Sequence, residues 1–449
     1  MLDILPAMIV LVILGGVIGM TKHFGKNLKP ESSRKIIHIT MGCVALSFPF
    51  VFQYRQSVLI LGIVAFIMLL VIRRNKKLRE GIGSGLLGVE RKTYGEIYFV
   101  ISIVIVFLLH ESLYEYLIPI SILTFADSVA ALVGTSYGRI NLSGLREDRK
   151  SGEGSIMFFV VAFICALIPL QLMSEVGRAE VLVISFLIGI LAAMIETVSA
   201  SGNDNLFLPL LTYSFIRFNT SQSLDLLLIK IGVMFLFLGI TVVVYKLTNI
   251  SRLSIAYSLL AGYVFLIQGG AIWMVPPIML FLTFGILPMM KKEEKEMVQN
   301  YKVIECNGMI GFICLWLSVF LPQYRGILYL AFSLSFACHL AINTYSRLIN
   351  FTESSREKAI LWGFVKASLF ISIPTVIIAQ MHWLTALLYF VCVAISLPPA
   401  VALNLKYNYK MVGDTTFRAN KTLVGAVVAI FIVVFAVYQP LINLVGALF

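Results

Sequence analysis

Asp127 is a carboxylate within an apolar run, in the segment LIPISILTFADSVAALVGTSYG. An ionisable group inside a membrane span is costly and marks a functional site by default. Ala131, Gly134 and Gly138 follow it at i+4, i+7 and i+11, so these small residues share one helical face with the carboxylate. Another backbone or a ligand can come close to such a face. We predict that Asp127 is functional; the alternative is an acid neutralised by a structural partner.

A pair of acids follows a later apolar run, in the segment ETVSASGNDNLFLP. Glu196 and Asp204 lie on either side of a Ser/Gly turn, and Asn205 adds an amide. Hard oxygen ligands of this kind suit Mg²⁺. The segment contains no Lys or Arg, which favours a metal–phosphate complex there. The alternative is a turn that carries ordinary solvated acids.

A polar loop, LREDRKSGEGSIMFF, precedes another apolar run that is predicted to begin its helix at Ser155. The N–H groups at a helix N-terminus attract anions, and glycines let the backbone approach a phosphate closely. The residues that could hold a phosphate are Arg149, Lys150, Ser151, Gly152, Gly154 and Ser155. Glu153 would be a poor neighbour for phosphate unless it helps to hold a metal. The alternative is a basic turn that caps a helix beside lipid headgroups.

A fourth element, SRKIIHI, stands at the start of another apolar run. Arg34 and His38 share a helical face at i and i+4, and Lys35 lies beside them. Anchoring to lipid headgroups is the alternative for Arg34 and Lys35. His38 lies one turn further into the run, so anchoring to lipid headgroups explains it less well.

The elements that must position these residues are membrane helices. The chain has 449 residues, of which 59% are hydrophobic and 13% charged, and its mean hydropathy is +0.94. No soluble globular domain of this length has such a composition. Apolar runs near the roughly 20 residues of a spanning helix recur along the chain, and a shorter run at 206–218 is ambiguous. The predicted fold class is an all-α, polytopic integral membrane protein with about 15–16 transmembrane helices.

Lys and Arg orient these spans, because cytoplasmic loops retain basic residues. If the short run spans and the N-terminus lies outside, 29 of the 35 Lys and Arg residues fall in inner segments and four in outer ones. Both termini are then expected outside, with the four polar elements near the cytoplasmic face. The net charge of +12 comes mostly from inner loops that face anionic lipid, so we expect no nucleic-acid partner. The six cysteines show no metal-ligand spacing.

Four elements in this order resemble the polyprenol kinase family, which includes dolichol kinases and phytol kinases and is related to the membrane cytidylyltransferases. They are RKIIH (34–38), DSVAALVGTSYG (127–138), KSGEGS (150–155), and Glu196 followed by DNLFLP (204–209). The resemblance implies a membrane catalytic domain over residues 1–220. It also implies that nucleotide and Mg²⁺ are held by Asp127, Lys150, Ser151, Glu153, Glu196 and Asp204.

In that family the γ-phosphate of a nucleotide, often CTP, passes to the terminal hydroxyl of an isoprenoid alcohol. The resemblance thus implies CTP (or ATP) as donor and an acceptor such as dolichol, phytol or geranylgeraniol, which enters from the lipid bilayer. Asp127 is the first candidate for the general base and His38 the second. Two alternatives stay open: a cytidylyltransferase that makes a CDP-activated lipid, and a non-enzymatic carrier of anionic lipids.

Residues 221–449 form a second predicted domain, which repeats the apolar spans without the chemistry. FACHLAINTYSRL (336–348) and MVQNYKVIECNG (297–308) faintly resemble the membrane phytyl-phosphate kinases, but Asn343 stands where that pattern carries an Asp. An amide cannot supply the same charge to Mg²⁺. We expect a degenerate or structural domain that forms substrate or homodimer surface. A bifunctional enzyme that makes the diphosphate is the alternative, because an intramembrane Asn is itself costly.

Overall fold

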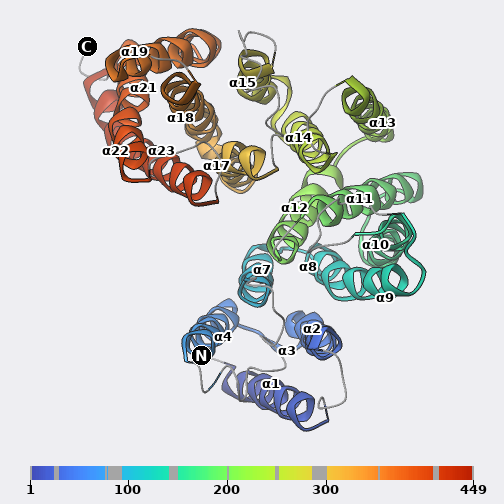
Figure 1. Ribbon diagram of the computed structural model, residues 1–449. Coiled ribbons are helices and arrows are strands. Elements are labelled where there is room, and N and C mark those ends of the chain that lie inside the picture. The colour runs from blue at the N-terminus through green and yellow to red at the C-terminus, as the bar shows by residue number, and fades with distance from the viewer. Residues whose placement is uncertain are drawn as a thin grey trace. The chain divides into compact units, whose positions relative to one another are not determined.

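The computed structural model describes residues 3–24, 30–75, 78, 94–140, 150–199, 202–247, 252–285, 301–351, 354–407 and 414–446. Within these ranges the chain forms helices and no β-strand (Figure 1). Ten of the described helices are long and apolar enough to cross a membrane, and five shorter apolar helices accompany them. The predicted fold class is confirmed: the chain is an all-α, multi-pass membrane protein.

Two compact units divide the chain between Val233 and Met234, within helix α13. The sequence placed the domain boundary earlier, at residue 220. The helices of the first unit are α1 (Ile4–Phe24), α2 (Pro30–Leu46), α3 (Phe48–Val51), α4 (Arg55–Arg74), α7 (Gly95–Leu109), α8 (Leu113–Ser121), η2 (Ile122–Ala126), α9 (Asp127–Tyr137), α10 (Gly152–Met173), α11 (Arg178–Val198), α12 (Asp204–Asn219) and the first part of α13 (Leu224–Leu247).

The second unit contains the rest of α13 and the remaining helices. They are α14 (Arg252–Val264), η3 (Phe265–Gly269), η4 (Ala271–Met274), α15 (Val275–Gly285), α17 (Tyr301–Phe320), η5 (Pro322–Tyr324), α18 (Arg325–Phe351), α19 (Arg356–Ala367), η6 (Ser368–Ser372), α20 (Ile373–Ile378), α21 (Trp383–Ile395), α22 (Leu397–Tyr407) and α23 (Asp414–Gly446). Helix α18 is buried along most of its length, with Phe332, Leu334 and Ala337 fully enclosed.

Helices α11 and α12 form the interior of the first unit. In α11, Ile184, Leu187 and Leu191 are almost completely buried, whereas α10 exposes Ile156 and Leu172 on its outer face. In α12 the residues from Leu208 to Ile216 are all buried. The ambiguous run at 206–218 is therefore an interior helix, and its polar residues explain why its hydropathy is low. Of the acids at the facing ends of these helices, Glu196 in α11 is buried and Asp204 in α12 is half-buried.

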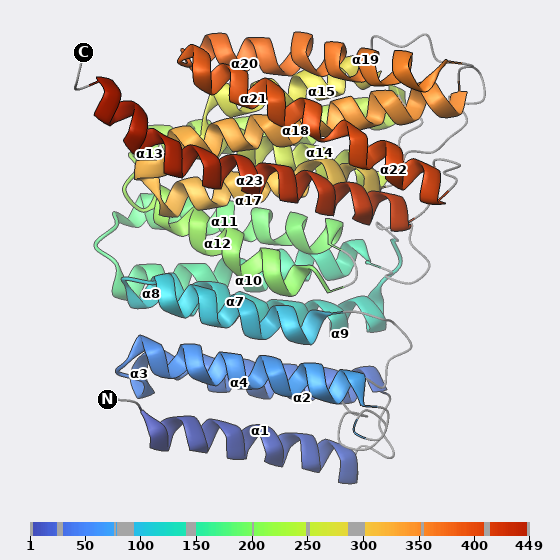
Figure 2. The same cartoon turned by 90° about the vertical axis from the view of Figure 1, so that its left-hand side faces the viewer.

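Helices α8, η2 and α9 form one continuous helix of 25 residues, Leu113–Tyr137, with α8 and α9 at its two ends (Figure 2). Its middle part, η2, is a π-helix that ends immediately before Asp127. Pro119 lies three residues before η2 and cannot donate a backbone hydrogen bond. The Thr124 hydroxyl donates to the Ile120 carbonyl within this segment, at 2.7 Å. π-helical turns of this kind often occur at functional sites, and here the turn sets the direction of Asp127.

Candidate functional site

Three carboxylates from three helices meet in the first unit. Asp127 begins α9, Glu196 lies near the end of α11, and Asp204 begins α12. One ligand oxygen from each lies within 4.8 Å of the others. The structure therefore brings together Asp127, Glu196 and Asp204, which the sequence had placed in two separate segments.

Two lysines lie against this acid cluster. Lys150 forms an ion pair and hydrogen bond with Glu196 Oε1. Lys35 Nζ lies 3.9 Å from Asp127 Oδ1 and donates to the Asp127 carbonyl at 3.4 Å. Burial lowers the pKa of Lys150, but the carboxylates of Glu196 and Asp204 raise it more, so the pKa lies above its ordinary value of 10.5. Lys150 is therefore a permanent cation beside the acids at neutral pH.

The burial of the Glu196 carboxylate indicates that the cluster suits a cation. Its side chain is only 9% exposed, and Oε2 is buried with no hydrogen-bond donor among the described residues. A buried charged oxygen without a donor costs free energy unless a metal or another cation compensates it. Three carboxylates offer the hard oxygen atoms that Mg²⁺ prefers. The donor set of Asp127, Glu196 and Asp204 therefore fits a divalent cation.

His38 lies on α2 next to this region. Its Nε2 donates to the carbonyl of Leu123, in η2, at 3.0 Å, and its ring packs against Phe99 with centroids 4.6 Å apart. Because a carbonyl only accepts hydrogen bonds, the proton sits on Nε2 in the neutral ring, which leaves Nδ1 as the basic nitrogen. His38 is thus held in one orientation by the π-helical segment that precedes Asp127.

Gly42 lets α2 approach η2 closely. A Cβ atom at this position would lie 2.2 Å from Thr124 Oγ1 and 2.5 Å from Thr124 Cγ2, distances that no real contact permits. The close approach brings Lys35 and His38 of α2 within reach of η2 and Asp127. Gly42 therefore positions two site residues without touching the acids itself.

The glycine-rich segment differs from its prediction. Helix α10 begins at Gly152, not at Ser155, and Ser151 is its N-cap, accepting from the Gly154 N–H at 3.1 Å. The Gly152 N–H donates to the Ile140 carbonyl at 2.8 Å, and the Ser155 N–H donates to the Ser151 carbonyl at 3.0 Å. These N–H groups already have partners, so they do not form the open phosphate cradle that the sequence suggested. Lys150 alone of the described loop residues reaches the acids.

Gly134 and Gly138 have a packing role in this structure. A Cβ at Gly134 would lie 2.9 Å from Ser151 Oγ, and one at Gly138 would lie 2.8 Å from the same atom. The small-residue face of α9 thus receives the N-terminus of α10 rather than open space for a nucleotide. The hydroxyl of Ser155 is also engaged, with Thr197 at 3.2 Å.

Glu153 lies apart from the acid cluster. Its carboxylate accepts a hydrogen bond from the Ile140 N–H at 3.3 Å. The positive charge of Arg139 also acts on this carboxylate. A first-turn acid is favourable at a helix N-terminus, which accounts for Glu153 without a metal. We therefore leave Glu153 out of the candidate metal site.

Asn205 also differs from its predicted role in cofactor binding. Its Nδ2 donates to the carbonyl of Gly95 at 3.0 Å, which ties the start of α12 to the start of α7. Arg149 lies outside the described residues, as does the side chain of Arg34, whose backbone belongs to α2.

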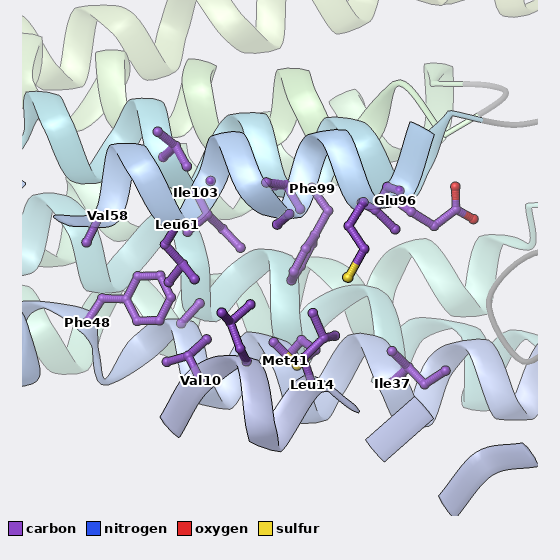
Figure 3. A pocket seen from close by; sticks show the side chains of 18 of the residues that line it. Val10, Leu14, Ile37, Met41, Phe48, Val58, Leu61, Glu96, Phe99 and Ile103 are labelled. Carbon is purple, nitrogen blue, oxygen red and sulfur yellow. The ribbon is translucent and has the colours of Figure 1, made fainter. Parts of the chain in front are cut away.

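An apolar cavity of about 120 Å³ lies between α1, α2, α4 and α7 (Figure 3). Three of its lining residues are polar: His38, Glu96 and Asn205. Glu96 pairs with Arg73 at 3.9 Å, and the Arg73 guanidinium lies 4.0 Å from the centre of the Tyr94 ring. Sequence reasoning missed this cavity. An acid at the start of an apolar run was the available clue.

The second unit contains its own half-buried polar pairs. Asn343 Nδ2 lies 3.4 Å from Asn307 Oδ1, and Lys421 Nζ lies 3.2 Å from Glu305 Oε1. No cluster of three ligand side chains is found among the described residues of this unit. Asn343 therefore has a neutral amide partner rather than an acidic site around it.

No family model matches the chain, and no curated protein and no solved structure is similar to it. The resemblance to polyprenol kinases therefore stays a prediction from the four sequence elements.

Proposed function

We propose that this protein is a membrane kinase that transfers the γ-phosphate of CTP (or ATP) to an isoprenoid alcohol and forms the prenyl monophosphate. The observation that carries the proposal is the acid cluster of Asp127, Glu196 and Asp204, with Lys150 and Lys35 beside it, inside an apolar helical unit. Charges of both signs at such a place are expensive to maintain without a function.

The cluster offers what phosphoryl transfer needs. That reaction requires little covalent help and depends on positioning and on cations around the developing negative charge. Mg²⁺ held by the three carboxylates would neutralise phosphate oxygens. Lys150 and Lys35 supply fixed positive charges next to the same acids, so phosphates at this site would meet cations from the protein as well.

Proton removal from the acceptor hydroxyl falls to one of two residues. Asp127 belongs to the acid cluster and pairs with Lys35. His38 lines the apolar cavity and keeps Nδ1 as its basic nitrogen, so it lies where a lipid alcohol would enter. We favour His38 as the base and Asp127 as a metal ligand, which reverses the order suggested by the sequence.

We place this site at the cytoplasmic face. The inner segments of the predicted topology hold most of the Lys and Arg residues. Lys150 and Lys35, which contact the acids, belong to two of these segments. Nucleotides are available to a site that opens on that side.

Radiolabel transfer by the full-length protein in lipid nanodiscs tests the proposal. We expect label from [γ-³²P]CTP or [γ-³²P]ATP to appear in an added prenol, with Mg²⁺ required. Asp127→Asn should lower the rate by about 10²–10³-fold, whereas Asp225→Asn, an exposed acid at the start of α13, should not.

Two other results would contradict the kinase. Label from [α-³²P]CTP in a lipid supplied with phosphatidate would identify a cytidylyltransferase. No transfer to any prenol or lipid phosphate, from a folded protein, would favour the anionic-lipid carrier.

A further inference from the structure

The apolar cavity of the first unit has one polar end. Its walls are apolar side chains from α1, α2, α4 and α7, and Figure 3 shows Phe48 and Val58 at one end and Glu96 at the other. Along α4 the lining runs from Val58 to Leu69, which corresponds to about 16 Å at the helical rise. The cavity is therefore elongated and amphipathic, as a site for a single lipid chain would be.

The polar end adjoins the acid cluster through the chain itself. Asn205, which lines the cavity, directly follows Asp204. His38 lines it too and lies one helical turn after Lys35, the partner of Asp127. A chain in this cavity would therefore have its head next to the residues that are proposed to hold phosphate.

The residues at the polar end select among lipids. The described lining residues include no Lys or Arg that would hold the anionic phosphate of a phospholipid, and Glu96 is already paired with Arg73. A neutral hydroxyl can donate a hydrogen bond to a carboxylate or to a histidine nitrogen. The lining thus suits an uncharged alcohol with one apolar chain.

We propose that this cavity holds the apolar chain of the acceptor alcohol, with the hydroxyl toward His38 and Glu96. The inference rests on the proposed kinase and adds the place of the acceptor. The depth of the cavity along α4 then limits how much of the chain is enclosed, so residues lining its middle determine chain-length preference.

Ala65 offers the test, because it lines the cavity on α4 and has room to be enlarged. Ala65→Phe should lower the ratio of long-chain to short-chain prenol turnover by about tenfold, since a long chain loses more buried apolar surface. Val64→Phe is the matched control. Val64 directly precedes Ala65 on α4, but its side chain is 44% exposed and does not line the cavity. An unchanged ratio in Ala65→Phe would overturn the assignment.

Photolabelling separates the cavity from the reaction. A prenol that carries a diazirine in its chain, added to the full-length protein in nanodiscs without nucleotide, should label peptides with Met41 and Met68, and unlabelled prenol should compete. Ala65→Phe should reduce this labelling several-fold, and Val64→Phe should not. Labelling confined to outer residues such as Ile67 would overturn the assignment, as would equal labelling by a diazirine phospholipid that prenol does not displace.

The two proposals fail in different ways. Competed cavity labelling without any phosphate transfer would remove the kinase and keep the alcohol site. Phosphate transfer with an unmoved chain-length ratio and no cavity labelling would keep the kinase and remove the alcohol site.

Discussion

Glu196 is the residue that most clearly requires a positive charge in the site. One carboxylate oxygen pairs with Lys150, and the other is buried without a donor among the described residues. A buried charge persists only when it is compensated. Lys150 supplies part of that compensation, and the remainder is what a bound cation would add.

Replacing Lys150 should show how far the stability of the fold depends on its pairing with Glu196. Lys150→Met leaves Glu196 buried without its partner, so we expect the free energy of unfolding to fall by about 2 kcal/mol, less than for a fully buried pair because Lys150 is partly exposed. Thermal unfolding in detergent measures this. The double variant Lys150→Met/Glu196→Gln should recover most of the loss, and Lys358→Met, an exposed lysine of α19, should show none. A single variant as stable as the wild type would contradict the compensation.

The pH dependence has a definite sign. Because the pKa of Lys150 lies above 10.5 in the folded protein, its stabilising contribution is complete below pH 10.5 and is lost as the pH rises through the folded pKa. Between pH 8 and pH 10, where the partner carboxylate is ionised, the Lys150→Met deficit should therefore stay constant when unfolding is measured at several pH values. A deficit that vanishes in this interval would show that Lys150 is neutral there.

The acids and Lys150 could be found from the sequence because charged residues within or directly beside apolar runs stand out. The roles of Gly152, Gly154 and Glu153 could not. Whether a helix N-terminus is open or capped depends on which carbonyl and hydroxyl groups lie next to it, and Ile140 and Ser151 take those places here.

At the scale of elements, the contact of α2 with η2 positions two site residues. Gly42 is the point of closest approach. The same contact places His38 against the Leu123 carbonyl and Lys35 against Asp127. The site is therefore sensitive to a residue that has no chemistry of its own.

Gly42→Ala should separate α2 from η2. The added Cβ meets Thr124, so we expect a loss of about 1–3 kcal/mol in stability from overpacking, together with reduced phosphate transfer. Thr124→Ala removes the two closest atoms, and the double variant should regain part of both. Gly16→Ala, where nothing lies within 4 Å of the added atom, is the control. Full activity in Gly42→Ala would show that the spacing of α2 is unimportant.

Hydropathy predicted the helices well because the bilayer imposes a length and an apolar surface on each span. The π-helix and the cavity escaped prediction, since both depend on how helices pack rather than on how apolar they are. The interior position of α12 was missed for the same reason: Tyr213 and Asn219 lower its hydropathy, yet both side chains are buried.

At the scale of the whole molecule, all three acids of the cluster belong to the first unit. The second unit contains paired polar groups, such as Asn343 with Asn307. The degenerate or structural role of the second half stays a prediction, as does the bifunctional alternative.

Asn343→Ala tests the separation of the two units. Monophosphate formation should stay within about twofold of the wild type, because groups without shared partners act nearly independently. Thin-layer separation of prenyl monophosphate and diphosphate products measures this in one assay. A tenfold fall in monophosphate would show that the second unit takes part, and a diphosphate product lost in Asn343→Ala would identify a second reaction.

The π-helix before Asp127 also makes this part of the chain tolerant of a very small change in its gene. A π-helical turn holds one residue more than the α-helix would need, so deletion of a single codon within 122–126 would restore a regular α-helix. The side chains beyond it would then keep their direction relative to α8, whereas the same deletion within α8 would turn them by about 100°. The loss of one residue would therefore leave Asp127 directed at the acid cluster in the first case and turn it away in the second.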